Sequence, residues 1–240
     1  MIEEKITNKS NCTGCHGCYA VCPTRCISMN HDNEGFLYPK VDRSKCVQCH
    51  QCIEVCPVIH PLPVNQDASG YACINQNEAE RFNSSSGGIF SLLAQKVLEQ
   101  GGKVFGAAFD QAFMVRHEAI ENSKDLYLLQ GSKYLQSRIG DTFEQVKALL
   151  NDGKHVLFSG TPCQVAGLKS FLGKKYDHLA AVDIVCHGVP SPKAWEKYLK
   201  YMKERKNDEV NAVFFRCKEK GWRKSALRIV FQKGASSRTL

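Results

Sequence analysis

Beyond residue 70 the chain alternates between short apolar runs and longer segments whose apolar residues recur every three or four positions. Short apolar runs predict strands, at 71–75, 103–110, 155–159, 179–185, 210–216 and 226–232. The longer periodicity predicts helices at 87–100, 141–152, 164–171 and 191–206, and glycines close the first two. Strands that alternate with helices are typical of an α/β domain with a mainly parallel sheet and helices on both faces.

The first 60 residues follow a different pattern, an internal repeat with an offset of 34 positions. The segments CTGCHGCYAVCP (12–23) and CVQCHQCIEVCP (46–57) both read C-x2-C-x2-C-x3-C-P. This is the spacing of two-cluster iron–sulfur loops, in which three close cysteines bind one cluster and the fourth binds the other. It assigns two ligand sets, one of Cys12, Cys15, Cys18 and Cys56 and one of Cys46, Cys49, Cys52 and Cys22.

Zinc is the alternative metal for such cysteines. Zinc ribbons use two separated C-x2-C pairs, so four cysteines within eleven residues, twice, favour two [4Fe–4S] clusters. His16 and His50 occupy equivalent spacer positions and are expected to be loop residues beside a cluster rather than ligands. Cys26 has no counterpart in the second repeat, and we expect it to be an ordinary small core residue.

Charge and composition narrow the class of partner. The chain carries a net charge of +8, and because acidic and basic residues balance within residues 1–60, the rest of the chain carries the whole excess. A basic body suits phosphate-bearing cofactors or an acidic electron carrier. No basic–aromatic strip or DNA-reading motif favours nucleic acid. With thirteen grouped cysteines, no secretory signal pattern and no long apolar run, we expect a cytoplasmic protein without a membrane span.

Three loops of the body combine glycines, hydroxyls and thiols at the ends of predicted elements. SSSGG (84–88) opens a helix, which suits phosphate binding but is equally a common helix start. GTPCQ (160–164) and VCHGVP (185–190) each follow a predicted buried strand. Ligands of parallel sheets bind at the carboxyl ends of strands, so Cys163 and Cys186 either share a site or are inert thiols.

The motifs together resemble one family. The two cysteine repeats joined by GFLYPKVD (35–42), followed by SSSGG, GSKYLQS (131–137), GTPCQVAGL (160–168) and VCHGVPSP (185–192), are similar to the coenzyme F420 hydrogenase/dehydrogenase beta-subunit family. The resemblance implies FAD and an oxidoreductase that passes electrons between ferredoxin or a partner subunit, two clusters, the flavin and a small organic acceptor such as a deazaflavin. It implies a flavin site at Ser85, Ser86, Gly87, Gly88, Lys133, Tyr134, Gln136, Thr161, Pro162 and Cys163. A third cluster at Cys163 and Cys186 stays open.

The expected organisation has three parts. Residues 1–60 form a ferredoxin-like α+β module with two clusters, 61–80 a linker and first strand, and 81–240 a flavin-binding α/β domain. Relatives usually continue beyond the position where this sequence ends, so we expect an incomplete domain. Two other interpretations remain, a non-catalytic electron-transfer subunit of a larger redox complex and a truncated relative without turnover.

Overall fold

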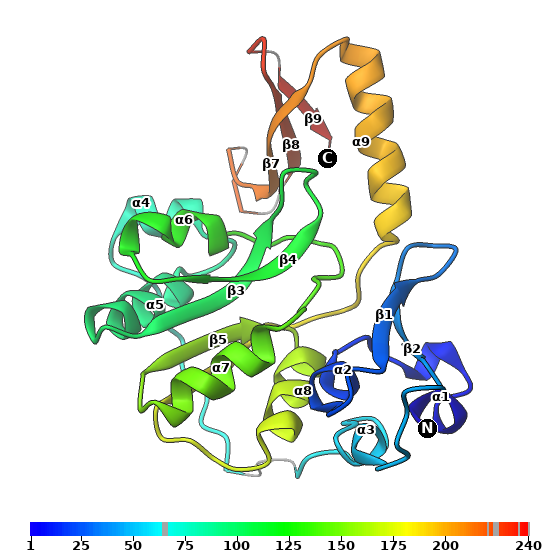
Figure 1. Cartoon of the computed structure of the whole chain (residues 1–240). Helices are drawn as coiled ribbons and strands as arrows, with labels where there is room; N and C mark the ends of the chain where they lie inside the picture. Colours follow the sequence, from blue (N-terminus) through cyan, green and yellow to red (C-terminus); the bar gives the residue numbers. More distant parts are fainter. Residues whose placement is uncertain (64–66, 220, 223–225, 235, 240) are drawn as a thin grey trace.

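The computed structural model describes residues 1–63, 67–219, 221–222, 226–234 and 236–239. These residues form a two-stranded, a four-stranded and a three-stranded sheet, which belong to three packed parts (Figure 1). An N-terminal module lies beside a central α/β layer. A third part, made of one long helix and the last sheet, packs against both of them.

The N-terminal module is built around a β-hairpin. Its elements are α1 (Ile2–Lys5), η1 (Lys9–Asn11), α2 (Gly17–Val21), β1 (Ile27–His31), β2 (Leu37–Val41) and α3 (Gln51–Glu54). Strands β1 and β2 pair antiparallel, with Ile27 opposite Val41. The apolar side chains of this hairpin and of Ile2 and Val55 pack around cysteines of both repeats. Residues 1–54 thus form a small α+β module, as the sequence predicts.

The central layer is a mixed sheet that is parallel except for one edge strand, where the sequence predicts a mainly parallel sheet. Its elements are α4 (Glu78–Asn83), α5 (Ile89–Glu99), β3 (Lys103–Phe109), β4 (Val115–Ile120), η2 (Ser123–Asp125), α6 (Leu126–Leu129), α7 (Thr142–Asn151), β5 (Val156–Gly160), α8 (Pro162–Leu172) and β6 (Leu179–Asp183). The strand order is β4-β3-β5-β6. Strands β3, β5 and β6 run parallel, whereas β4 pairs antiparallel with β3 because a short turn connects them.

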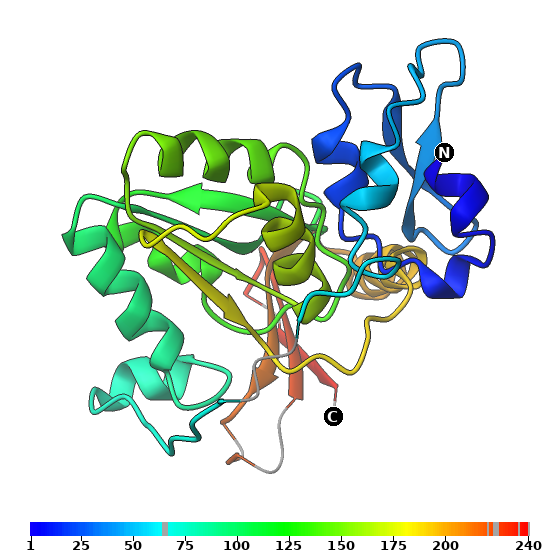
Figure 2. The same cartoon turned by 90° about the horizontal axis from the view of Figure 1, so that it is seen from below.

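Both faces of this sheet are covered, because successive strand residues point to opposite sides. Phe105 and Phe158 pack with α7 and α8 on one face. Val104 and Leu157, their neighbours in sequence, pack with α5 and α6 on the other. Helices therefore cover both faces of the sheet, which is the α/β arrangement that the sequence pattern predicts (Figure 2).

The C-terminal strands do not extend the central sheet. Helix α9 (Pro192–Lys206) is followed by β7 (Val210–Cys217), β8 (Ala226–Phe231) and β9 (Ser236–Thr239), which form an antiparallel sheet of their own. Trp195, Leu199 and Met202 share one face of α9 and pack on the inner side chains of β7 and β8. The mainly parallel sheet predicted for this domain therefore does not include β7 and β8, because α9 supplies them with a separate core.

Residues 71–75 are not the predicted strand. Tyr71 and Ile74 are exposed, and the Asn75 amide donates to the Gly87 carbonyl in a loop contact. The Asn75 backbone is thus bonded to the SSSGG loop rather than to a neighbouring strand. Part of the expected linker, 64–66, lies outside the described residues. No described helix is both long and apolar enough to cross a membrane.

Candidate functional site

The two sets of four cysteines gather in two separate small cavities. Cys12, Cys15, Cys18 and Cys56 line one cavity of about 20 Å³. Cys22, Cys46, Cys49 and Cys52 line another of about 20 Å³. Each set therefore combines three cysteines of one repeat with the last cysteine of the other repeat, as the spacing predicts. We call these cavities the first and the second thiol site.

The crossing of ligands follows from two short helices. Helix α2 begins after His16 and α3 after His50, equivalent positions that both adopt left-handed backbone conformations, with φ of 65° and 60°. Each helix starts immediately after the loop and carries its repeat's last cysteine to the opposite site. The helices pack against each other in the core of the module, and the repeat thus becomes an approximate two-fold arrangement of thiols.

The chemistry of these sites fits iron–sulfur clusters. A cube binds its four thiolates at four separate irons, so the sulfurs surround a cavity rather than converge on a point. Among the described residues no three His, Cys, Asp or Glu side chains converge as one metal ion would require. Burial raises the pKa of the Cys15 thiol to about 11 and also raises the pKa of the Cys18 thiol well above its ordinary value. Cluster assembly must therefore displace protons from these thiols.

The side chain of His16 gives a second indication that the first thiol site suits an iron–sulfur cluster. Its ring is 1% exposed, lines this site, and has no hydrogen-bond partner among the described residues for either nitrogen. Burial, with smaller contributions from Arg138 and His117, lowers its pKa to about 3. A neutral imidazole with an unused N–H suits a sulfur-rich acceptor in the cavity. His50 instead is exposed beside the second site.

The two thiol sites differ in exposure. Cys15, Cys18 and Cys56 of the first site are buried, whereas Cys49 of the second site is exposed. The neighbouring Val47 is 63% exposed. The first site faces the body of the protein, and the second faces solvent.

A large cavity of about 770 Å³ begins where the first thiol site ends, and Cys12 lines both. Its wall combines the cysteine loop with the SSSGG loop, the GSKYLQS loop, and the ends of β5 and β6. Eight of the ten predicted flavin-site residues line it, namely Ser85, Ser86, Gly87, Gly88, Lys133, Gln136, Thr161 and Cys163. Tyr134 and Pro162 do not. Tyr134 packs edge-on against Phe215, and Pro162 is an exposed first residue of α8.

The SSSGG loop is held in place by contacts with two other segments. The Ser85 hydroxyl accepts hydrogen bonds from the Ser132 amide (2.6 Å) and hydroxyl (2.8 Å). Gly88 precedes α5 with a φ of +79°, and a Cβ on Gly87 would lie 2.8 Å from the Cys73 carbonyl oxygen. Glycine is thus required by close packing at Gly87 and by backbone conformation at Gly88.

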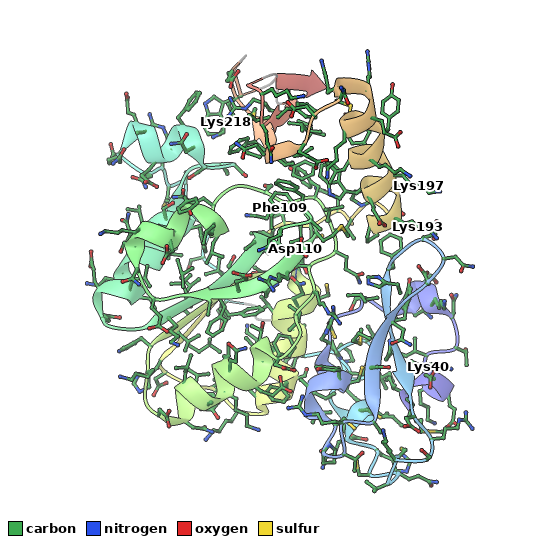
Figure 3. The ribbon with its side chains drawn as sticks, turned by 45° about the horizontal axis from the view of Figure 1, so that its top comes forward. Lys40, Phe109, Asp110, Lys193, Lys197 and Lys218 are labelled. Carbon is green, nitrogen blue, oxygen red and sulfur yellow. The ribbon has the colours of Figure 1, made fainter. Side chains whose placement is uncertain are left out.

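Lys133 places a cation in the cavity wall. Its ammonium donates to the carbonyls of Gln130 (3.0 Å) and Gly131 (3.4 Å) and lies 5.9 Å from the ring centre of Phe109. Phe109 is the last residue of β3 (Figure 3). No carboxylate of the described residues forms an ion pair with Lys133. Burial lowers its pKa to about 8. Such a lysine is suited to bind an anion.

Helix α8 joins the first thiol site to the large cavity. Cys163, in its first turn, lines the large cavity, and its thiol lies 3.1 Å from the Thr161 hydroxyl oxygen. Gly167, one turn later on the same face, is so close to the cysteine loop that an added Cβ would be 3.1 Å from the Cys15 sulfur. Cys186 also lines the cavity and is exposed.

Gln136 connects the two parts of the chain directly. Its side-chain oxygen accepts from the Leu37 amide at 2.7 Å, and its side-chain nitrogen lies against Gly14 of the first cysteine loop. Tyr19 adds a hydrogen bond to Asp141 across the same interface (2.9 Å). The cysteine loop and the cavity are therefore held in fixed relation.

His117, which the sequence analysis did not select, completes the cavity wall. Its Nε2 lies 3.0 Å from the Ser159 carbonyl and must carry the proton, so its Nδ1 accepts from the Ser137 hydroxyl at 2.7 Å. Burial lowers its pKa to about 4. The neutral ring ties the GSKYLQS loop to the end of β5. The sequence offered one signal for His117, because it stands at a position of 115–120 where the alternation of the strand points the side chain inward.

Comparisons with known proteins agree with this arrangement. Residues 11–59 match the family described as 4Fe-4S dicluster domain. Residues 153–239 match the family that describes the C terminus of the coenzyme F420 hydrogenase/dehydrogenase beta subunit. No match was found among curated protein sequences.

Thirteen chains of solved structures match as well. One is from the F420-reducing [NiFe] hydrogenase complex of Methanosarcina barkeri, with 14% identity and a TM-score of 0.46. The similarity covers 74% of this chain and 63% of that one, so this chain spans less than two thirds of that chain. The two family matches thus give the chain a 4Fe–4S dicluster domain, typical of electron transfer, at its N-terminal end, and a region similar to the C terminus of the coenzyme F420 hydrogenase/dehydrogenase beta subunit over residues 153–239.

Proposed function

We propose that the chain is an iron–sulfur flavoprotein oxidoreductase. It binds FAD in the large cavity and passes electrons between a redox partner, such as ferredoxin or a partner subunit, and a small organic acceptor such as a deazaflavin. The observation that carries the proposal is the position of Cys12, which lines both the first thiol site and the large cavity. A ring bound there would be in direct contact with the wall of a cluster site.

The wall of the cavity has the groups that a dinucleotide requires. The SSSGG loop opens α5, an eleven-residue helix, and a helix start of this kind offers backbone N–H groups to phosphate. Lys133 adds a positive charge. The volume of about 770 Å³ lies within the range typical of cofactor sites. Ser85, by contrast, is already engaged with Ser132 and holds the loop in shape.

The flavin would supply the conversion between single electrons and hydride, which a cluster alone cannot perform. The chain's own residues define the route. Cys49 opens the second thiol site to solvent and so marks the side where a partner docks. Cys22 and Cys56, the crossed ligands, join the second site to the first. Cys12 and α8 then connect the first site to the cavity.

Replacing Gly87 with valine tests the cofactor assignment. The new side chain collides with the Cys73 carbonyl and distorts the loop that would bind phosphate. We expect bound FAD to be lost, while iron stays at about eight atoms per chain. Gly70→Val is the matched control, because Gly70 has open space around it and should retain both cofactors.

Flavin and iron are measured on anaerobically reconstituted protein by absorbance and by chemical analysis. Full FAD content in Gly87→Val would contradict the phosphate assignment. An unsubstituted chain that binds iron but no FAD would contradict the proposal itself and favour a non-catalytic electron-transfer subunit.

A further inference from the structure

The second thiol site contains a fifth cysteine. Cys26 lies outside the cysteine motif, yet its sulfur is 3.4 Å from that of Cys22 and it lines the same cavity as Cys22, Cys46, Cys49 and Cys52. The residue is 5% exposed. The sequence analysis expected an ordinary core residue here. Cys26 is buried, but it also lies at the second thiol site, which the spacing of the repeat does not indicate.

The backbone holds Cys26 independently of the cysteine loops. Its carbonyl accepts from the Asp42 amide at 2.8 Å, and the next residue, Ile27, pairs with Val41 in the hairpin. Arg25, with a φ of 52° and a hydrogen bond to the Cys22 carbonyl, turns the chain so that both thiols reach one cavity. Cys26 therefore keeps its place even if Cys22 is lost.

The repeat provides an internal comparison. The offset of 34 residues places His60 where Cys26 stands in the first copy, just as it places Cys56 where Cys22 stands. The His60 side chain is 51% exposed, lies 3.8 Å from Glu54, and does not line the first thiol site. The position equivalent to Cys26 therefore carries no thiol at the first thiol site.

We propose that Cys26 is a substitute ligand of the second cluster, able to take the coordination position of Cys22. With Cys22 bound as thiolate, Cys26 is the donor of the S–H···S contact. In the exchange the Cys22 sulfur leaves iron and accepts the proton that Cys26 gives up, while Cys26 binds as thiolate. The net charge of the site and the oxidation state of its iron do not change.

Exposure explains why the spare thiol belongs at this site. The second thiol site is open to solvent at Cys49, whereas three of the four cysteines of the first site are buried. Oxidants and chelators therefore reach the second site first. This inference requires the two clusters but is independent of the flavin proposal.

Matched alanine variants of the crossed ligands test the proposal. In anaerobically reconstituted protein we expect Cys22→Ala to keep about eight irons per chain and the low-temperature EPR signals of two reduced clusters. Cys56→Ala, which has no spare thiol, should lose iron from the first site. The double variant Cys22→Ala/Cys26→Ala should lose iron from the second site. If Cys22→Ala loses as much iron as Cys56→Ala, or if the double variant keeps the iron of the single one, the proposal is wrong.

A second measurement uses a variant that retains all eight motif cysteines. Cys26→Ala removes one buried sulfur and should assemble both clusters. On timed exposure to air, its second-site signal should decay several-fold faster than in the unsubstituted chain, while the first-site signal decays at an unchanged rate. Equal decay of the second-site signal in the two proteins would overturn the proposal even if Cys22→Ala fails to fold.

Discussion

The lysine in the cavity wall predicts a pH dependence of FAD binding. Burial lowers the Lys133 pKa from 10.5 to about 8, and among the described residues two backbone carbonyls accept hydrogen bonds from its ammonium. A bound phosphate would favour the charged form and raise the pKa again. FAD binding above pH 8 must therefore be accompanied by proton uptake at this side chain.

The magnitude follows from the shift. Full reversal, from about 8 to 10.5, corresponds to about 3 kcal/mol. Because part of the side chain meets solvent, screening reduces this to about 1–2 kcal/mol, or roughly a fivefold to thirtyfold change in Kd. Below pH 7.5 the lysine is charged and Kd should be constant. As the pH rises through 8, Kd should rise, by at most about tenfold per pH unit.

Quenching of FAD fluorescence by the reconstituted protein, measured between pH 6.5 and 9, gives the required Kd values. Lys133→Met should bind about fivefold to thirtyfold more weakly at pH 7 and show a flat profile. Lys133→Arg should bind with a flat profile because arginine does not titrate in this range. Lys124→Met, an exposed lysine outside the cavity, serves as control. A rise in Kd above pH 8 that persists in Lys133→Met would refute the assignment.

Two further substitutions probe the contacts between the parts. Gly167→Val would drive its side chain into Cys15, where even a Cβ comes within 3.1 Å of the sulfur. Overpacking of about 1–3 kcal/mol should loosen the first cluster and speed the release of its iron to a chelator. An unchanged release rate would contradict the close packing of α8 against the cysteine loop. His117→Gln tests acid sensitivity. The folded chain holds the His117 pKa at about 4 against 6.5 when unfolded, so the unfolded state gains a proton first as pH falls, and stability is lost between pH 6.5 and 4, by up to about 3 kcal/mol. Glutamine does not titrate, so thermal unfolding should show a smaller pH dependence in the variant, and an equal dependence would assign the acid sensitivity elsewhere.

The thiol sites could be predicted because their information is local. Spacing alone groups three cysteines in a loop, and the short helix that follows carries the fourth to the other site, which needs only the second copy of the repeat. Cys26 escaped this reasoning. The position of Cys26 beside Cys22 depends on the turn at Arg25 and on the β1–β2 hairpin, and the spacing of the cysteines predicts neither of them.

The large cavity could be predicted only in part. Glycines and hydroxyls at the start of α5 and α8 identify loops that suit a ligand, since the requirement lies within five residues. Gln136 shows the limit. Its partners, Leu37 and Gly14, lie about a hundred residues earlier, so its role as a link between module and body has no local signature. The failed strand at 71–75 is the opposite case, where local composition indicated a strand but the Asn75 backbone bonds to the SSSGG loop instead of to a sheet.

The arrangement makes α8 the element that sets the distance between the first cluster and a ligand in the cavity. Cys163 and Gly167 are four residues apart and so lie on one face of the helix, one against the cavity and the other against Cys15. The capping box of Thr161 and Gln164 fixes where that helix begins, and the Gln164 side chain also donates to the Ser137 carbonyl at 3.3 Å. A shift of α8 would therefore move the cavity wall and the cluster loop together. Electron transfer between cofactors depends on their separation, so a helix that contacts both the cavity and the cysteine loop fixes that separation better than two independently mobile loops would. The close approach of α8 to Cys15 is possible because Gly167 has no side chain.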